Sequence, residues 1–450
     1  MKGKKRGLSA GSVLVLLLTV IVSVCCVLLF VRFQGDSRNM SMDAQKVIRV
    51  LGDALQGPTP EAGPQPTVRT VTVTLAPPAS TPAPTRAPEN TDAAAPAVQE
   101  TVVPQERKHF SFTLTAGGIL GFQSDISDSV YRKQDKSFDY QSVFSLLGDR
   151  VHADLNLAVL SNVLNVEDQK YADVFAPADV LSGVKEAGFD LLLLNSEHAL
   201  DQGVKGALDT AQVIYEKGFS SLGISAGPSQ SSGMISINGG SVAILTYTET
   251  LTVKGKNALE TDEGKDMMRL FDPERAQQEI RAAKAQGAGC VIVCIHWGKE
   301  DSTSVTQSMR KNARLLADAG ADLILGAHPT RVLPMEILEC KDEKGRSREA
   351  FVAYSMGSLL TESRDGYDIS GALLHLQITC HEDGQVTFSR PEYTPTYIWR
   401  QIVNEKWQYR VVASDAPAPE GMEQKQLEVM GRALSRIQET LKDSPVTQRK

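Results

Sequence analysis

Residues 289–300 read GCVIVCIHWGKE, and this stretch decides the class of fold. Its first seven residues are apolar, which is typical of a strand covered on both faces, and polar residues follow where the strand ends. The same order recurs in FDLLLLNSEHALD at 189–201 and in DLILGAHPT at 322–330. Helical patterns between and after such strands cover 178–187, 208–217, 273–286, 306–319 and 422–441. This alternation predicts an α/β domain with a largely parallel sheet that helices cover on both faces.

Weaker strand signals surround this centre. They cover 110–115, 153–160, 220–224, 241–247 and 350–355, and then a terminal β-rich section at 371–379, 385–389 and 409–412. The strand at 110–115 runs into Gly117 and Gly118, and this pair predicts a turn. The globular domain is therefore expected at 109–400, with a C-terminal strand and helix in 401–450.

Composition narrows the possible functions. The chain has 450 residues, of which 42% are hydrophobic, so it can bury a sizeable core. Lys and Arg number 47 against 54 Asp and Glu, which gives a formal net charge of -7. A nucleic-acid partner is not expected, because binding phosphates requires a basic surface. Six cysteines are too few for a disulfide framework. A bond between Cys340 and Cys380 is left open.

The N-terminus predicts a membrane anchor. Residues 12–31 read SVLVLLLTVIVSVCCVLLFV without a charge, which is about the length a helix needs to cross a bilayer. Lys2, Lys4, Lys5 and Arg6 precede it. The positive-inside rule then predicts a cytoplasmic tail at 1–11, a transmembrane helix at 12–33 and an extracytoplasmic remainder in a single-pass membrane protein. A cleaved signal peptide is the alternative, but no small-residue cleavage pattern follows the apolar run.

A long linker is expected after the anchor. Eleven of the 21 prolines lie within 57–104, among Thr, Ala and Ser. Such a composition cannot bury enough apolar surface to offset the entropy lost on ordering. We therefore expect residues 34–108 to be a juxtamembrane segment and a disordered stalk.

Three of the seven histidines come directly at the ends of apolar strands. They are His198, His296 and His328. In open α/β sheets, ligands bind outside the carboxyl ends of strands, where imidazole suits ligation of a divalent metal or acid–base chemistry. A loop histidine that only completes local hydrogen bonds is the alternative for each one alone. We expect the three imidazoles to share one cleft.

The order and sequence of these segments resemble those of the CapA family, the poly-γ-glutamate capsule biosynthesis proteins with a metallophosphatase-like core. The resemblance lies in SEHALDQGVKGALDT at 196–210, Gly223, HWGKE at 296–300, AGADLILGAHPT at 319–330 and YSMGSL at 354–359. It covers roughly 112–361 and implies a metallophosphatase-like layered sandwich. It also implies work on an envelope or capsule polymer, with an anionic polymer or other capsule-synthesis membrane proteins as partners.

The chain departs from the family pattern where metal ligands are expected. The usual Gly-Asp after the first strand reads Gly117-Gly118, and Ser161 stands where the family has the Glu of Asn-Leu-Glu. The usual Asn-Asn-His, His-Pro-His and final Gly-Asn read Ser196-Glu197-His198, His328-Pro329-Thr330 and Gly357-Ser358. Two nearby cations need carboxylates to screen their repulsion. The resemblance therefore implies a degenerate site that binds at most one divalent ion.

Site roles are assigned on this basis. His198, His296, Glu300 and His328 are the catalytic candidates. The three histidines are also the metal ligands, with Glu197 or Glu300 left open as a further ligand of the same ion. Substrate binding is assigned to Glu197, Asp201, Trp297 and Ser358. If the pocket is otherwise intact, Gly118→Asp together with Ser161→Glu should raise ion affinity. Whether the chain is an enzyme stays open, because a scaffold or ligand-binding domain that has lost its metals fits the same departures.

Overall fold

The computed structural model describes residues 73–74, 109–165, 171–172, 174–227, 229–363, 368–403 and 405–449. All of them belong to one compact unit, Thr70–Lys450. The predicted basic tail at 1–11, the anchor at 12–33 and the linker at 34–108, apart from 73–74, lie outside the described residues. Within the described ranges, no helix is long and apolar enough to cross a membrane.

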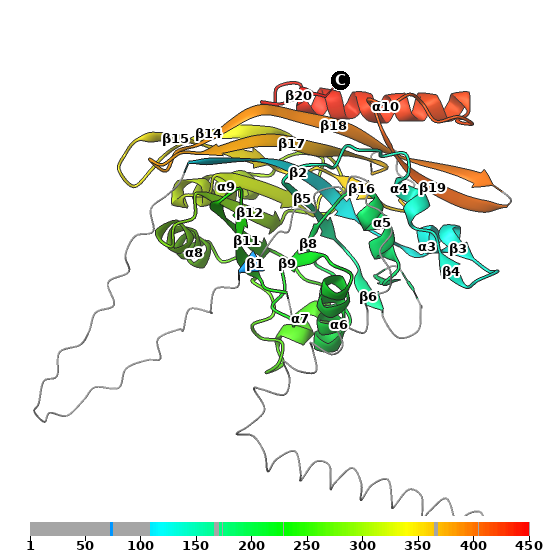
Figure 1. Cartoon of the computed structure of the whole chain (residues 1–450), viewed down its shortest axis with the longest axis horizontal. Coiled ribbons are helices and arrows are strands. Elements are labelled where there is room, and N and C mark those ends of the chain that lie inside the picture. The colour runs from blue at the N-terminus through cyan, green and yellow to red at the C-terminus, as the bar shows by residue number, and fades with distance from the viewer. Residues whose placement is uncertain are drawn as a thin grey trace, which may run out of the picture. The chain divides into compact units, whose positions relative to one another are not determined.

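The unit is built on two sheets rather than one (Figure 1). In spatial order, the first sheet contains β1 (Val73–Thr74), β10 (Ser232–Ile237), β11 (Gly240–Thr248), β12 (Cys290–His296), β13 (Leu323–Ala327), β15 (Ser347–Ala353) and β14 (Met335–Lys341). The four strands β11, β12, β13 and β15 run parallel, while β10 and β14 pair antiparallel to their neighbours. The two-residue strand β1 lies within the segment predicted to be linker and pairs with β10.

The second sheet joins the start of the domain to its end. In spatial order it contains β19 (Lys406–Ala413), β18 (Val386–Val403), β17 (Ser370–Cys380), β2 (Phe110–Leu120), β5 (Leu155–Leu160), β8 (Leu191–Leu193) and β9 (Ser220–Leu222). Two short strands attach to it, β16 (Ser358–Leu360) beside β2 and β20 (Thr447–Gln448) beside β18. Two small ladders lie apart, β3 (Tyr131–Arg132) with β4 (Ser137–Phe138) and β6 (Val163–Asn165) with β7 (Phe175–Pro177).

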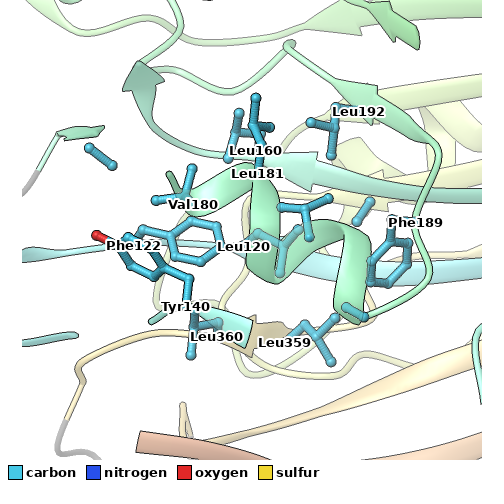
Figure 2. Packing of buried hydrophobic residues seen from close by; sticks show 14 of the residues in the cluster. Leu120, Phe122, Tyr140, Leu160, Val180, Leu181, Phe189, Leu192, Leu359 and Leu360 are labelled. Atoms are coloured by element: carbon cyan, nitrogen blue, oxygen red, sulfur yellow. The ribbon is translucent and has the colours of Figure 1, made fainter. Parts of the chain in front are cut away.

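Helices cover the outer faces of the two sheets. One apolar cluster draws on strands of both sheets, and two others lie beneath helices. On the first sheet, α8 (Pro273–Ala285) and α9 (Gln307–Ala319) pack side by side. On the second, α3 (Ser124–Val130), α4 (Gln141–Phe144), α5 (Val180–Glu186) and α6 (Gly203–Glu216) contribute residues to one apolar cluster. Figure 2 shows the part of this cluster that includes Val180 and Leu181 of α5. The last helix, α10 (Gln424–Leu441), lies along β17 and β18 (Figure 1), and α7 (Val253–Leu259) contacts α6.

The fold is thus a mixed α/β layered sandwich, as predicted, but the expectation of one largely parallel sheet is wrong. Helix boundaries agree well where capping signals are strong. Asp272 accepts a hydrogen bond from the Arg275 amide at 2.8 Å before α8. Thr306 does the same for Met309 at 3.2 Å before α9, which ends at Gly320 with φ +118°. Side-chain oxygens at these positions satisfy amides that have no partner inside the helix.

The predicted turn at Gly117 and Gly118 is also wrong, because β2 continues through both residues. Gly118 lies against the main chain of Gly357, whose carbonyl accepts a hydrogen bond from Ile119 at 3.0 Å. A Cβ atom on Gly118 would lie 2.0 Å from that carbonyl oxygen. The glycine therefore serves close contact between strands rather than a change of chain direction.

The described cysteines are free and buried, so Cys340 and Cys380 are not bonded to each other. Each belongs to a strand, Cys340 to β14 and Cys380 to β17, and both have their side chains in apolar clusters. Their role in the fold is that of small hydrophobic residues.

Buried His375 should make stability depend on pH. Its two ring nitrogens lie 3.3 Å from the Thr115 hydroxyl and 3.0 Å from the Thr394 hydroxyl, and burial lowers its pKa to about 4. Because this folded pKa lies below the unfolded value of about 6.5, the stabilisation is present above pH 6.5 and is lost as the pH falls towards 4. Urea unfolding at pH 7 and 4.5 should show that the parent loses about 2.5 kcal/mol more than His375→Gln.

The control for this measurement is His152→Gln, because the His152 side chain is 85% exposed. This variant should keep the pH dependence of the parent. Equal pH dependence in His375→Gln and the parent would contradict the assignment of this stabilisation to His375.

Candidate functional site

The site lies where strand ends of the two sheets meet. β8 of the second sheet leads into the loop that carries Glu197 and His198, while β12 ends at His296 and β13 is followed by His328. Asn195 fixes this junction, because its amide donates to the carbonyls of Tyr247 at 3.1 Å and Cys294 at 3.2 Å in the first sheet. A single buried side chain thus sets the loop after β8 against the ends of β11 and β12.

Glu197, His296 and His328 form one cluster of ligand-type atoms. Their candidate atoms all lie within 4.8 Å of one another. His296 Nε2 is in direct contact with Glu197 Oε2, and His328 Nδ1 lies 3.3 Å from the same oxygen. The rings of His296 and His328 have centroids 4.4 Å apart. The structure therefore gathers two of the predicted histidines around Glu197, the carboxylate expected either to bind substrate or to add a further ligand.

Electrostatics within the cluster favour an ionised carboxylate beside a neutral imidazole. Burial alone would raise the pKa of Glu197, but hydrogen bonds from His296 and His328 hold that pKa far below its ordinary value. Burial lowers the pKa of His296, although Glu197 opposes this. A neutral His296 that donates its Nε2 proton to an ionised Glu197 agrees with the lowered pKa of both groups. The cluster therefore presents a negative charge to a cation.

His198 belongs to a neighbouring pair with Asp201 instead of the cluster. Its Nδ1 donates to Asp201 Oδ2 at 2.7 Å, and Thr252 donates to the other oxygen of that carboxylate. The hydrogen bond to Asp201 raises the pKa of His198, and the charge of Glu197 adds to the effect. His198 Nε2 lies 3.4 Å from Glu197 Oε1, and its side chain is 31% exposed. His198 therefore lies beside the cluster through Glu197, but its Nδ1 is already engaged by Asp201.

The donor set of the cluster fits one divalent ion. Two histidines and one glutamate are a set that catalytic zinc sites use, with a further position open for water or substrate. Two such atoms on one tetrahedral ion lie about 3.4 Å apart, which matches the separation of His328 Nδ1 from Glu197 Oε2. An ion on this nitrogen would require the proton that His328 donates to Glu197 to move to Nε2. An ion on His296 Nε2 would require these two contacting groups to separate and the proton to move to Nδ1. That atom is buried and has no partner among the described residues.

The loop that carries His328 is held by main-chain contacts. His328 has φ +95°, a conformation uncommon for residues with a side chain. Two residues later, the Thr330 amide donates to the Glu300 carbonyl at 2.9 Å, and the Thr330 hydroxyl contacts the same oxygen. The Glu300 side chain is exposed, and its charge contributes to the raised pKa of His198. Glu300 thus lies close enough to influence the site, with its main chain supporting the His328 loop.

Two predicted substrate-binding residues have no access to a ligand. Trp297 is completely buried, its indole N–H donates to the Tyr354 carbonyl at 3.0 Å, and its ring stacks on Tyr354. Ser358 is 1% exposed within β16. Both assignments are corrected to packing roles, because a side chain without solvent contact cannot meet a polymer. Their proximity to the motif histidines in sequence was misleading.

Two residues that contact the site framework were missed. Thr252 caps α7 through a bond from the Gly255 amide at 3.1 Å while it contacts Asp201. Glu249 directly follows β11 and accepts a hydrogen bond from the Gly298 amide at 3.0 Å. The strand-end rule that identified His296, applied to the strand predicted at 241–247, would have pointed to Glu249.

Fold and site together define a class, a mixed α/β sandwich whose strand ends carry a carboxylate–imidazole cluster suited to a divalent cation. The family model described as "Bacterial capsule synthesis protein PGA_cap" matches residues 113–363. The chain belongs to this family, and the resemblance expected from its motifs is confirmed.

Two named relatives agree with this family. The chain is 27% identical over 275 residues to "Capsule biosynthesis protein CapA" from Bacillus anthracis, a match that covers 58% of this chain and 62% of that protein. It is 32% identical over 157 residues to "PGA biosynthesis protein CapA" from Bacillus subtilis (strain 168), which covers 34% and 40%. The matched part thus spans less than two thirds of the length of either relative.

Similarity to solved structures is lower. The NAD nucleotidase NadN of Haemophilus influenzae gives a TM-score of 0.40 at 13% identity and covers 74% of this chain and 61% of that chain. The sulfate thiohydrolase SoxB of Thermus thermophilus, in complex with glycerol, gives 0.31 at 14% identity and covers 63% and 43%. Neither protein's activity is carried over to this chain.

Proposed function

We propose that the chain works in the synthesis of a capsule or cell-envelope polymer of the poly-γ-glutamate type, with a degenerate metallophosphatase-like site that binds one divalent ion. Family membership and the names of the two relatives support the polymer. The observation that carries the ion is the cluster of Glu197, His296 and His328, whose ligand atoms lie within 4.8 Å of one another. Glu197 supplies negative charge that Gly118 and Ser161 do not supply.

The residues around the cluster suit acid–base chemistry at an electrophilic bond of such a polymer. An ion held there would act as a Lewis acid. His198 keeps its Nδ1 proton on Asp201, and its raised pKa favours a second proton on Nε2, which faces the cluster. A histidine held in this way can donate a proton to a leaving group and take it back. The polymer, the reaction and the acid–base role of His198 belong to the proposal.

Replacement of His296 in a producing strain tests the polymer and the site together. We expect that deletion of the gene and His296→Ala each lower the glutamate polymer on washed cells at least tenfold, measured by amino-acid analysis after acid hydrolysis. Glu279→Ala is the control. Glu279 belongs to α8 and accepts a hydrogen bond from the Tyr247 hydroxyl, and it is not part of the cluster. Unchanged polymer in the deletion strain would contradict the polymer assignment.

A metal-free scaffold or ligand-binding domain is the second candidate function. The site departures at Gly118, Ser161 and Thr330 favour it. It predicts that deletion lowers the polymer while His296→Ala supports the full amount. The two candidates are thus separated by the same set of strains.

The proposed location is the extracytoplasmic face of the cell membrane, with a single N-terminal anchor. The uncharged run at 12–31 after four basic residues supports it. Protease added to cells without a wall should release a fragment that begins within 57–104. Full protection of the domain would place it in the cytoplasm and contradict the proposal.

A further inference from the structure

Glu249 is bonded to the residues on both sides of Trp297. It lies directly after β11, whose last residue, Thr248, pairs with His296. Its amide donates to the His296 carbonyl at 2.8 Å, and its Oε2 accepts from the Gly298 amide at 3.0 Å. One residue thus holds the chain immediately before and immediately after Trp297.

The second carboxylate oxygen ties this turn to a helix. Glu249 Oε1 accepts from the side-chain amide of Asn312 at 2.8 Å. Asn312 is 8% exposed and belongs to α9, which packs on β13 and β14. Both oxygens of a half-buried carboxylate are therefore engaged, and their donors come from different elements. Such a bridge restricts the turn that begins at His296 to one position.

His296 has particular need of this support. A histidine that binds a metal is ordinarily oriented by a hydrogen bond from its other ring nitrogen. The Nδ1 of His296 is buried without a partner among the described residues. What orients this ring is therefore its main chain, together with the contacts to Glu197 and to the ring of His328.

We propose that Glu249 is a positioning residue that fixes His296 through the main chain and takes the place of the missing hydrogen bond to Nδ1. It touches neither the cluster's ligand atoms nor, by this account, the substrate. The inference rests on the proposed ion site only where ion affinity is read out. The effect of Glu249 on the His296 imidazole is independent of any ion.

The test uses the full chain in detergent, with histidine labelled by ¹⁵N, and records the imidazole resonances of His296 without added metal. Glu249→Ala should shift or broaden these resonances, while Glu279→Ala should leave them in place. Glu279 is a matched control, because it also contacts side chains outside its own helix: it accepts a hydrogen bond from Tyr247 and forms an ion pair with Arg269. Titration with Zn²⁺ should then show at least tenfold weaker binding in Glu249→Ala than in the parent.

An exchange of donor and acceptor guards against a variant that fails to fold. Glu249→Gln alone presents an amide nitrogen to one of two donors and should disturb His296. Adding Asn312→Asp supplies an acceptor for that nitrogen, so the double variant should restore the resonances of the parent. Unchanged His296 resonances in Glu249→Ala and Glu249→Gln, or equal shifts in Glu279→Ala, would overturn the inference. A parent chain that binds no Zn²⁺ would overturn the proposed ion site, and the metal-free resonances would still decide the role of Glu249.

Discussion

Gly118→Ala should lower the free energy of unfolding by about 3 kcal/mol, because the new methyl group has no room. The added carbon would lie 2.0 Å from the Gly357 carbonyl oxygen and 2.9 Å from its carbon, both of them main-chain atoms. This carbonyl is held by the Ile119 amide at 3.0 Å, and the next residue, Ser358, donates to the Thr330 carbonyl at 3.0 Å. Urea unfolding of the variant and the parent measures the difference.

Gly431→Ala is the matched control, since it makes the same chemical change in open space. Gly431 lies inside α10, and nothing lies within 4 Å of its added methyl position. It should stabilise the chain by up to about 1 kcal/mol, because alanine favours helix more than glycine does. A Gly118→Ala variant as stable as the parent would contradict the packing described for β2 and β16.

The same contact bears on the Asp that the family pattern leads us to expect at position 118. The sequence predicts that Gly118→Asp together with Ser161→Glu raises ion affinity if the pocket is otherwise intact. The structure contradicts this at Gly118, where the main chain of Gly357 occupies the position that a side chain would take. Near Ser161, the buried Asn162 bonds both main-chain groups of Phe122, at 2.7 and 3.2 Å. Main-chain and side-chain contacts thus fill the space at both positions.

Glu197→Gln should weaken divalent-ion binding by about 100-fold or more. Loss of a residue that only supports a ligand already costs about 10- to 100-fold, and Glu197 is the charged member of the ligand cluster itself. An amide keeps the size of the side chain but removes the negative charge that two imidazoles surround. Isothermal titration of the purified full chain with Zn²⁺ measures the change.

Two further variants make this titration specific. Glu300→Gln removes an exposed carboxylate near the site and should change the affinity less than threefold. His198→Gln distinguishes the ligand set predicted from sequence, which includes His198, from the cluster in the structure, which does not. In the structure His198 is bonded to Asp201. Its loss should cost far less affinity than loss of Glu197. An affinity unchanged in Glu197→Gln but abolished in His198→Gln would favour the set predicted from sequence.

Much of the fold follows from local signals in the sequence. α8 and α9 were predicted closely because capping residues mark their starts, and β12 because its apolar run is long. Which strands share a sheet could not be predicted, since a parallel strand–helix rhythm is compatible with one sheet or two. β10 and β14 were missed because their sequences, SGMISI and MEILECK, mix polar with apolar residues and lack a long apolar run.

The site was predicted in location and only partly in detail. The strand-end rule correctly brought His296 and His328 together, because parallel strands end at the same edge of a sheet. Sequence order alone could not show which of Glu197 and His198 faces the cluster. That choice depends on Asp201, which bonds His198 from another side and itself accepts a hydrogen bond from Thr252. Trp297 was misassigned because burial of a loop residue depends on tertiary contacts such as its bond to Tyr354.

The count of tightly bound divalent ions per chain tests the central claim most directly. The full chain, purified in detergent, would be equilibrated with Zn²⁺, freed of loosely bound metal and analysed by mass spectrometry of the metal content. The cluster of Glu197, His296 and His328 predicts one ion per chain, lost in Glu197→Gln. Two ions per chain would mean that other residues replace the carboxylates absent at Gly118 and Ser161. No bound ion would contradict the metal site and leave the scaffold as the function of this domain.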